Sequence, residues 1–124
     1  MTKLNKKILV VEDDKNLLLV LQEKFINEGF SVVTALDGEE GLIVTEKEKP
    51  DLILLDIRMP KIDGITMARK LKEAGVDVPI IFLTNLGDIE HISNTIEVSK
   101  SDYLIKSNWN LDDIVKKVKA KLGL

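Results

Sequence analysis

The sequence contains no cysteine, which excludes disulfide bonds, thiolate metal sites and cysteine nucleophiles. It has a single histidine, His91, so a metal site built from several histidines is also excluded. No apolar stretch approaches the ~18 residues that a membrane span needs, and the residues after Met1 are polar and basic. We therefore expect a cytoplasmic protein with neither a signal peptide nor a membrane-spanning helix.

The chain also lacks a concentration of positive charge. Its formal net charge is −3, and lysines are interspersed with acidic residues along most of its length. A nucleic-acid surface needs clustered basic side chains, so direct binding to nucleic acid is not expected. The chain has 124 residues, of which 44% are hydrophobic. We expect one domain with one buried core over residues 1–124.

Two kinds of segment alternate regularly along the chain. Short apolar segments, typical of strands covered on both faces, are followed by segments with apolar residues at helical spacing. The expected strands are residues 7–11, 31–35, 51–56, 79–84 and 102–106, and the expected helices are residues 15–28, 38–49, 64–74, 88–98 and 111–121. This alternation predicts an α/β fold, in which right-handed crossover helices cover both faces of a parallel sheet.

Polar residues mark the beginnings of several expected helices. Asp14 is the expected N-cap of the first helix. Asp37 with Glu40, and Asn110 with Asp113, have the spacing of a polar cap and an acid three residues later. These pairs predict where two further helices begin.

Polar residues also follow four of the apolar strands. Glu12 and Asp13 follow the first strand, Asp56 ends the third, Thr84 ends the fourth and Lys106 ends the fifth. In open parallel sheets, ligands bind outside the carboxyl ends of the strands. We therefore expect these five side chains to converge at one edge of the sheet.

Three carboxylates held close together repel one another, and a cation lowers that cost. A site with only oxygen ligands and several carboxylates suits Mg²⁺. One carboxylate can then attack phosphorus, as aspartates do when they form aspartyl phosphates. The lysine and the hydroxyl would stabilise the charge that develops during transfer. The residues thus predict magnesium-dependent phosphoryl chemistry.

Four segments resemble the receiver domain of two-component response regulators. They are ILVVEDD, DLILLDIRMPKIDG, FLTN and DYLIK, and the similarity extends from Lys7 to about Leu122. The resemblance implies a flavodoxin-like (βα)5 fold, a doubly wound five-stranded parallel sheet of order 2-1-3-4-5 with helices on both faces. It implies a stand-alone signalling switch without an output domain, and not an enzyme. A histidine kinase or phosphotransfer protein would donate its phosphoryl group.

The resemblance also implies a role for each residue of the acidic site. Asp56 would be the phosphoacceptor and Asp13 a direct Mg²⁺ ligand. Glu12 would hold the metal through water, and the backbone carbonyl of Arg58 would complete the protein ligands.

Further roles implied by the resemblance concern the response to phosphorylation. Thr84 would hydrogen-bond the phosphoryl group, Lys106 would pair with it, and Tyr103 would change rotamer on activation. The face of the fourth helix, fifth strand and fifth helix would then bind a downstream protein. The protein would be a monomer or a phosphorylation-dependent dimer.

Several positions depart from the family pattern, among them Ser99 and Lys100, which stand where a Gly-Ala pair is common. Ser107 follows Lys106 where proline is common, and without proline a cis peptide there costs ~3 kcal/mol. Trp109 lies in a loop that is one residue longer than usual. Asn85 follows Thr84 where a small residue is common, and it can either bind the phosphoryl group or hinder water. The lifetime of the phosphorylated form is therefore left open.

The first helix contains a candidate docking surface. Its expected core face consists of Leu17, Val20, Leu21 and Phe25, which leaves Leu19 and Ile26 on the outer side. The family uses this helix to meet the helical bundle of the kinase, which favours docking. Scattered exposed apolar residues are also ordinary, so both interpretations stay open.

Two other functional classes fit parts of the pattern. Phosphatases of the haloacid dehalogenase type carry a second aspartate two residues after the nucleophile, and Arg58 stands there instead. A degenerate receiver would act as an unphosphorylated protein-interaction module. The complete set of acids argues against that module, whereas Ser107 and the altered loop keep it open. No glycine-rich phosphate loop is present to support nucleotide use.

Overall fold

The computed structural model describes residues 4–84, 101–105 and 110–124. Its elements are β1 (Lys7–Val11), α1 (Lys15–Asn27), β2 (Ser31–Ala35), α2 (Gly38–Glu48), β3 (Leu52–Asp56), α3 (Gly64–Glu73), β4 (Ile80–Thr84), β5 (Ser101–Ile105) and α5 (Leu111–Lys121). These bounds agree to within one residue with those expected from the sequence. The helix expected over residues 88–98 lies outside the described residues.

All five strands are parallel, and their order across the sheet is β2-β1-β3-β4-β5. This order confirms the flavodoxin-like topology. Because the strands run in the same direction, their carboxyl ends lie along one edge of the sheet. The chain reverses its direction of winding between β1 and β3, which is where ligands bind in folds of this kind.

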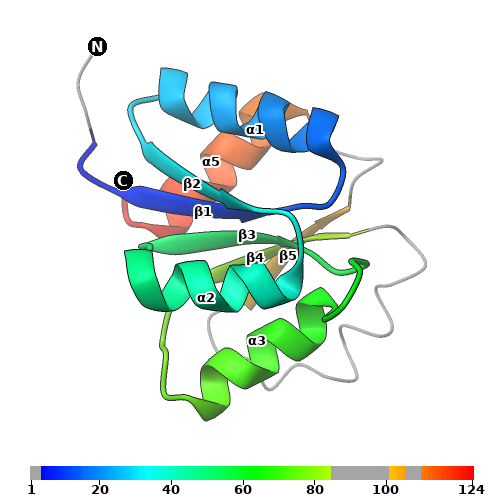
Figure 1. The fold of residues 1–124 in the computed structure, drawn as a ribbon. Coiled ribbons are helices and arrows are strands. Elements are labelled where there is room, and N and C mark those ends of the chain that lie inside the picture. Colours follow the sequence, from blue (N-terminus) through cyan, green and yellow to red (C-terminus); the bar gives the residue numbers. More distant parts are fainter. Residues whose placement is uncertain (1–3, 85–100, 106–109) are drawn as a thin grey trace.

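The helices form a layer on each face of the sheet, with α1 and α5 on one side and α2 and α3 on the other (Figure 1). In β1, Ile8 and Val10 belong to the core beneath α1 and α5, whereas Leu9 and Val11 belong to the core beneath α2 and α3. Successive residues of a strand point to opposite faces. A strand covered on both faces is therefore apolar without interruption, as the sequence is here.

The buried face of α1 differs from the one expected. Leu18, Leu21 and Phe25 are buried and Leu17 is half-buried, but Val20 is 45% exposed, so its assignment to the core was wrong. Residues 17–21 are all apolar, so periodicity alone does not single out one face of this segment. Packing against the sheet and α5 selects the face that contains Leu18.

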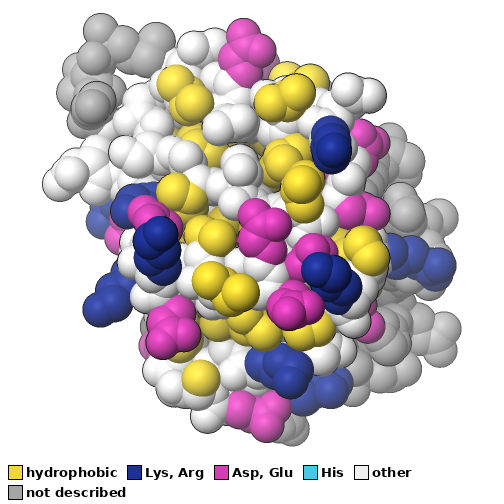
Figure 2. All heavy atoms as spheres, viewed as in Figure 1, with side chains coloured by type: hydrophobic (Ala, Val, Ile, Leu, Met, Phe, Trp, Pro, Cys, Tyr) yellow, Lys and Arg dark blue, Asp and Glu magenta, His cyan; other side chains and the backbone are white. Residues whose placement is uncertain are grey.

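The outer side of α1 is apolar in part, as predicted. Leu19 is 60% exposed and Ile26 is 50% exposed. Apolar side chains lie among polar ones over this helix, at the top of Figure 2. Together with Val20, these residues give α1 an apolar outer surface.

Three predicted N-caps are present. The Asp14 carboxylate accepts hydrogen bonds from the N–H groups of Asn16 and Leu17, at 3.0 and 3.3 Å. Asp37 caps α2, and Asn110 forms a reciprocal capping box with Asp113 at the start of α5. Each cap satisfies an N–H group that has no partner within its helix.

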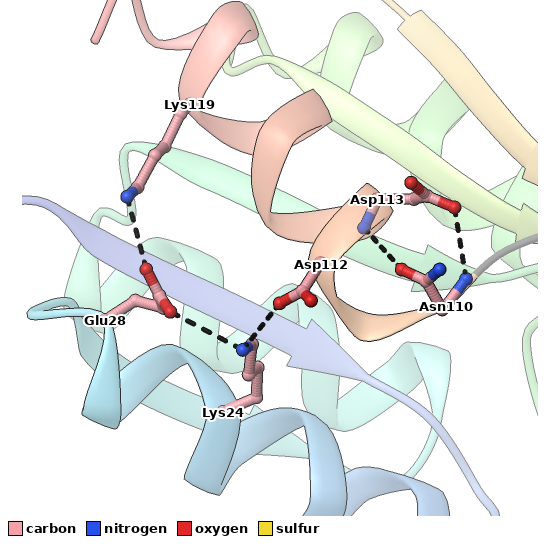
Figure 3. A network of polar contacts seen from close by, with 6 residues as sticks. All are labelled: Lys24, Glu28, Asn110, Asp112, Asp113 and Lys119. Atoms are coloured by element: carbon pink, nitrogen blue, oxygen red, sulfur yellow. Dashed lines mark hydrogen bonds and ion pairs between the residues drawn. The ribbon is translucent and has the colours of Figure 1, made fainter.

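A network of charged side chains joins α1 to α5 (Figure 3). Lys24 Nζ lies 2.8 Å from Asp112 Oδ1 and 3.5 Å from Glu28 Oε2. Lys119 Nζ lies 3.2 Å from Glu28 Oε1. The contacts of Lys24 with Asp112 and of Lys119 with Glu28 link residues from opposite ends of the chain and join α5 to α1.

Among the helices described, none has the length and apolar character needed to cross a bilayer.

Candidate functional site

Carboxylates from two neighbouring strands meet at the carboxyl edge of the sheet. Val11, the last residue of β1, lies beside Leu55 of β3 in the parallel register. The residues that follow these two positions are Glu12 and Asp56, and Asp13 follows Glu12 in the segment between β1 and α1. One carboxylate oxygen from each of the three acids lies within 4.8 Å of the others. The structure thus brings together the three acids that the sequence places at this edge.

Glu12 is held in place by its neighbours. Only 1% of its surface is exposed. Its backbone N–H donates to the carbonyl of Ala35 at 3.1 Å, and its Oε2 accepts from the N–H of Asp14 at 3.1 Å. The bond from Asp14 connects Glu12 to the residue that caps α1. The position of this carboxylate is therefore coupled to the start of the helix.

Asp56 is 5% exposed, whereas Asp13 is exposed. The backbone around Asp56 is packed closely against the start of α3. A Cβ atom added to Gly64 would lie 2.2 Å from the carbonyl oxygen of Asp56, and the Gly64 N–H donates to the Ile57 carbonyl at 2.8 Å. The absence of a side chain at Gly64 is therefore required for this approach. Asp63 caps the helix by accepting from the Thr66 N–H at 2.7 Å.

The other predicted site residues are described only in part. Thr84 ends β4 and lies beside Ile105 of β5, and Tyr103 lies beside Phe82. Arg58 is exposed in the loop after β3. The backbone therefore places Thr84 at the same edge as the acids. Several residues that the sequence analysis discussed lie outside the part of the chain that the structure describes: Lys106, Asn85, His91, Ser107 and Trp109.

The three acids fit a hard divalent cation. All their ligand atoms are oxygen, and the 4.8 Å limit on their separation places them around a space that one ion can share. Ionised carboxylates this close raise one another's energy, and a bound cation removes that cost. Two of the three are buried, which strengthens the electrostatic interaction with a bound ion.

Two residues in segments that follow strands at the same edge of the sheet were not predicted to have a role. Lys61, in the loop after β3, has a φ of 67° and lies with its Nζ 3.7 Å from Asp37 Oδ2. Gly38, at the start of α2, packs so closely that an added Cβ would lie 2.3 Å from the Ile62 carbonyl oxygen. A glycine at the first position of a helix is a poor helix former, and this was the only signal available.

A hollow of about 580 Å³ lies between the C-terminal ends of α2 and α3. Its walls include Leu42, Leu71 and Val78. The segments that line it precede β3 and β4, so the hollow lies at the amino ends of these strands. It is therefore separate from the acidic site.

Comparison with known proteins identifies relatives that share the whole or part of this chain. The sporulation initiation phosphotransferase F of Bacillus subtilis is 32% identical over 121 residues, which cover 98% of this chain and 97% of that protein. The alkaline phosphatase synthesis transcriptional regulatory protein PhoP of the same organism is 41% identical over 103 residues, covering 83% of this chain and 43% of PhoP. The chain spans about two-fifths of the length of several curated relatives.

A solved structure gives the same result for the fold. The response regulator protein TrrA of Thermotoga maritima, in complex with Mg²⁺ and BeF, superposes with a TM-score of 0.78 and 34% identity, covering 94% of this chain and 98% of TrrA. The family model for the response regulator receiver domain matches residues 8–119. The chain therefore belongs to the response regulator receiver domains, the phosphoacceptor signalling domains of two-component systems.

Proposed function

We propose that Asp56 accepts the phosphoryl group and that Glu12 and Asp13 hold Mg²⁺ beside it, with the Arg58 backbone carbonyl as a further ligand. The observation that carries this proposal is the meeting of three carboxylates from two strand ends within 4.8 Å. TrrA, which shares 34% of its sequence, was solved with Mg²⁺ and BeF, and this supports a metal in the present site. The receiver is a signalling switch and not a classical enzyme.

The chemistry at Asp56 is a single transfer. A carboxylate oxygen of Asp56 attacks the phosphorus of a phosphohistidine, an O–P bond forms, and the P–N bond of the donor breaks. The donor imidazole keeps the electron pair and takes up a proton. A bound Mg²⁺ would offset the negative charge of the phosphoryl oxygens. The backbone of Asp56 is packed closely against Gly64, which favours a defined position for the residue that carries the attacking carboxylate.

Thr84 and Lys106 are proposed to act on the phosphoryl oxygens. Thr84 follows Leu83, which lies beside Asp56 in the register of β3 and β4. Lys106 follows Ile105, which lies beside Thr84. The strand register therefore supports placing a hydroxyl donor and an ammonium near the acceptor, where both would stabilise developing charge. We propose that Tyr103, on β5, changes rotamer on phosphorylation and thereby alters the face that includes β5 and α5.

The proposed partners are a histidine kinase or phosphotransfer protein as donor and a downstream protein as target. A relative named as a phosphotransferase supports a role in a phosphorelay, and a relative named as a transcriptional regulator supports a role in two-component signalling.

We propose that the donor docks on the outer side of α1, where Leu19 and Ile26 are 60% and 50% exposed. Replacing both by serine should slow transfer from a phosphorylated histidine phosphotransfer protein while leaving phosphorylation by acetyl phosphate unchanged. Equal slowing of both reactions would contradict docking at this surface.

The test of the proposed chemistry is intact-mass spectrometry after incubation with acetyl phosphate, with and without Mg²⁺. We expect one phosphoryl adduct in the wild type, which disappears in Asp56→Asn and in the absence of Mg²⁺. Asp14→Asn is the matched control, because Asp14 is adjacent to the acids but caps α1, and asparagine caps a helix equally well. If a folded wild-type protein that binds Mg²⁺ forms no adduct, the proposal fails and an unphosphorylated interaction module becomes the better explanation.

A further inference from the structure

We propose that Gly38 is a positioning residue for the metal site, although it lies on a different element from every proposed ligand. The backbone of Gly38 packs against Ile62, which belongs to the loop of residues 57–63. This inference depends on the proposed function, since it concerns the Mg²⁺ that Glu12, Asp13 and Asp56 are proposed to hold. It goes further by assigning α2 a part in placing the loop that carries Arg58.

The first observation is the close packing of Gly38 against Ile62. A Cβ at position 38 would lie 2.3 Å from the Ile62 carbonyl oxygen and 3.0 Å from both its carbonyl carbon and its Cβ. Two of these atoms belong to the backbone, so they cannot swing aside as the end of a side chain can. Ile62 is itself packed against the core beneath α2 and α3. Any side chain at position 38 would therefore push the loop outward.

The second observation is the shape of the loop itself. The Ile62 N–H donates to the Pro60 carbonyl at 2.8 Å, which closes a three-residue turn with Lys61 at its centre. The φ of Lys61 is 67°, in the left-handed region that non-glycine residues seldom adopt. Turns of this kind are rare and strained, so surrounding contacts must hold them in place.

The third observation is the pairing of the same turn with the residue before Gly38. Lys61 Nζ lies 3.7 Å from Asp37 Oδ2, while Asp37 Oδ1 caps α2 by accepting from the Glu40 N–H at 2.8 Å. The Lys61 side chain is 61% exposed, so this ion pair is a weak contact. The backbone packing at Gly38 is therefore the stronger constraint, and the ion pair adds to it.

Contacts hold the loop near both of its ends, on either side of Arg58. At its beginning, the carbonyl groups of Asp56 and Ile57 lie against Gly64, which donates to the Ile57 carbonyl. Near its end, Ile62 packs against Gly38. Arg58 follows directly after Ile57, which is buried. Displacement at Ile62 would therefore be transmitted along the short segment that contains the Arg58 carbonyl.

Isothermal titration of MgCl2 into the wild type and Gly38→Ala tests this inference. Loss of a contact that orients a metal ligand typically weakens affinity by about 10–100-fold, and we expect Gly38→Ala to raise the Kd for Mg²⁺ by about tenfold. Gly75→Ala is the matched control. Gly75 has a positive φ, 78°, which Gly38 lacks, and a Cβ at position 75 meets no atom within 4 Å. It should lower stability by backbone strain and leave the Kd unchanged.

Lys61→Met provides a second variant that folds even if Gly38→Ala does not, because Lys61 is exposed. We expect it to raise the Kd about two- to threefold at low salt and to lose that effect at high salt, as a screened surface pair should. An unchanged Kd in folded Gly38→Ala, or an equal rise in Gly75→Ala, would overturn the inference while leaving the metal site intact. A wild type that binds no Mg²⁺ would overturn both the inference and the proposed function.

Discussion

Lys24 of α1 and Asp112 of α5 form an ion pair of 2.8 Å across 88 positions of sequence. The hydrogen bond between them is the main cause that raises the pKa of Lys24 and lowers the pKa of Asp112. The pKa of Glu28 is lowered chiefly by its hydrogen bond from Lys119. All three pKa shifts favour the charged forms, so the charged side chains are more stable in the folded state than in the unfolded chain.

We therefore expect this network to contribute to stability at neutral pH and to lose that contribution in acid. The ordinary pKa values are 3.8 for Asp112 and 4.5 for Glu28, and both are lowered in the folded protein. Their contribution is present above the ordinary values and is lost as the pH falls through the lowered ones. Lys24 behaves in the opposite sense, since its raised pKa gives a contribution that is lost only at alkaline pH.

Urea unfolding of the wild type and Asp112→Asn, measured from neutral pH into acid, checks this expectation. Asp112→Asn should be slightly less stable at neutral pH, lose less stability on acidification, and approach the wild type in high salt. Glu23→Gln, an exposed acid of α1 outside the network, should follow the wild type. Identical acid dependence in Asp112→Asn and the wild type would show that the pair adds nothing to stability.

Phe25 and Ile26 are neighbours on α1 with opposite environments. Phe25 is fully buried, with its ring centroid 5.5 Å from that of Phe30, whereas Ile26 is 50% exposed. We expect Phe25→Ala to lower the free energy of unfolding by about 3–5 kcal/mol, because it removes buried surface and leaves a cavity. Ile26→Ala should change it by less than about 0.5 kcal/mol. Denaturant unfolding of the two variants measures the difference, and similar losses would contradict the described orientation of α1.

Asn110 begins α5 with a reciprocal capping box, in which its side chain accepts from the Asp113 N–H at 2.9 Å. Replacing it by alanine should lower the free energy of unfolding by about 1 kcal/mol, since an N–H of the first turn loses its partner. Asn110→Asp retains a capping oxygen and should be nearly neutral. Thermal unfolding followed by circular dichroism distinguishes the two variants. Equal stability of both would mean that the cap is unimportant for α5.

In the absence of Mg²⁺, repulsion among the three acids should make the wild type less stable than a variant that has one acid fewer. Asp13→Asn removes one of three carboxylates that lie within 4.8 Å, which relieves mutual repulsion. We expect this variant to have a Tm about 2–4 °C higher than that of the wild type in Mg²⁺-free buffer. The rise in Tm that Mg²⁺ gives the wild type should be much smaller in the variant. Scanning calorimetry with and without Mg²⁺ measures both effects, and an unchanged response to Mg²⁺ would exclude Asp13 as a ligand.

Much of this fold follows from local chemistry. The strands are apolar without interruption because both faces of the sheet are covered, and Asp14, Asp37 and Asn110 mark helix starts because their oxygens satisfy free N–H groups. The topology rule for parallel sheets then places Glu12, Asp13 and Asp56 at one edge without any knowledge of coordinates. Residues at strand ends are thus predictable, since connectivity alone brings them together.

The order of the described elements, the parallel sheet and the convergence of the three acids could be predicted from sequence, because each depends on periodicity, capping or chain connectivity. Tertiary structure alone decided which face of α1 is buried, since the apolar run of residues 17–21 suits several faces and packing selects Leu18 over Val20. It also decided the Lys24–Asp112 pair and the contact of Gly38 with Ile62. These last features join segments distant in sequence, and their distances are set by how the layers pack rather than by any local pattern.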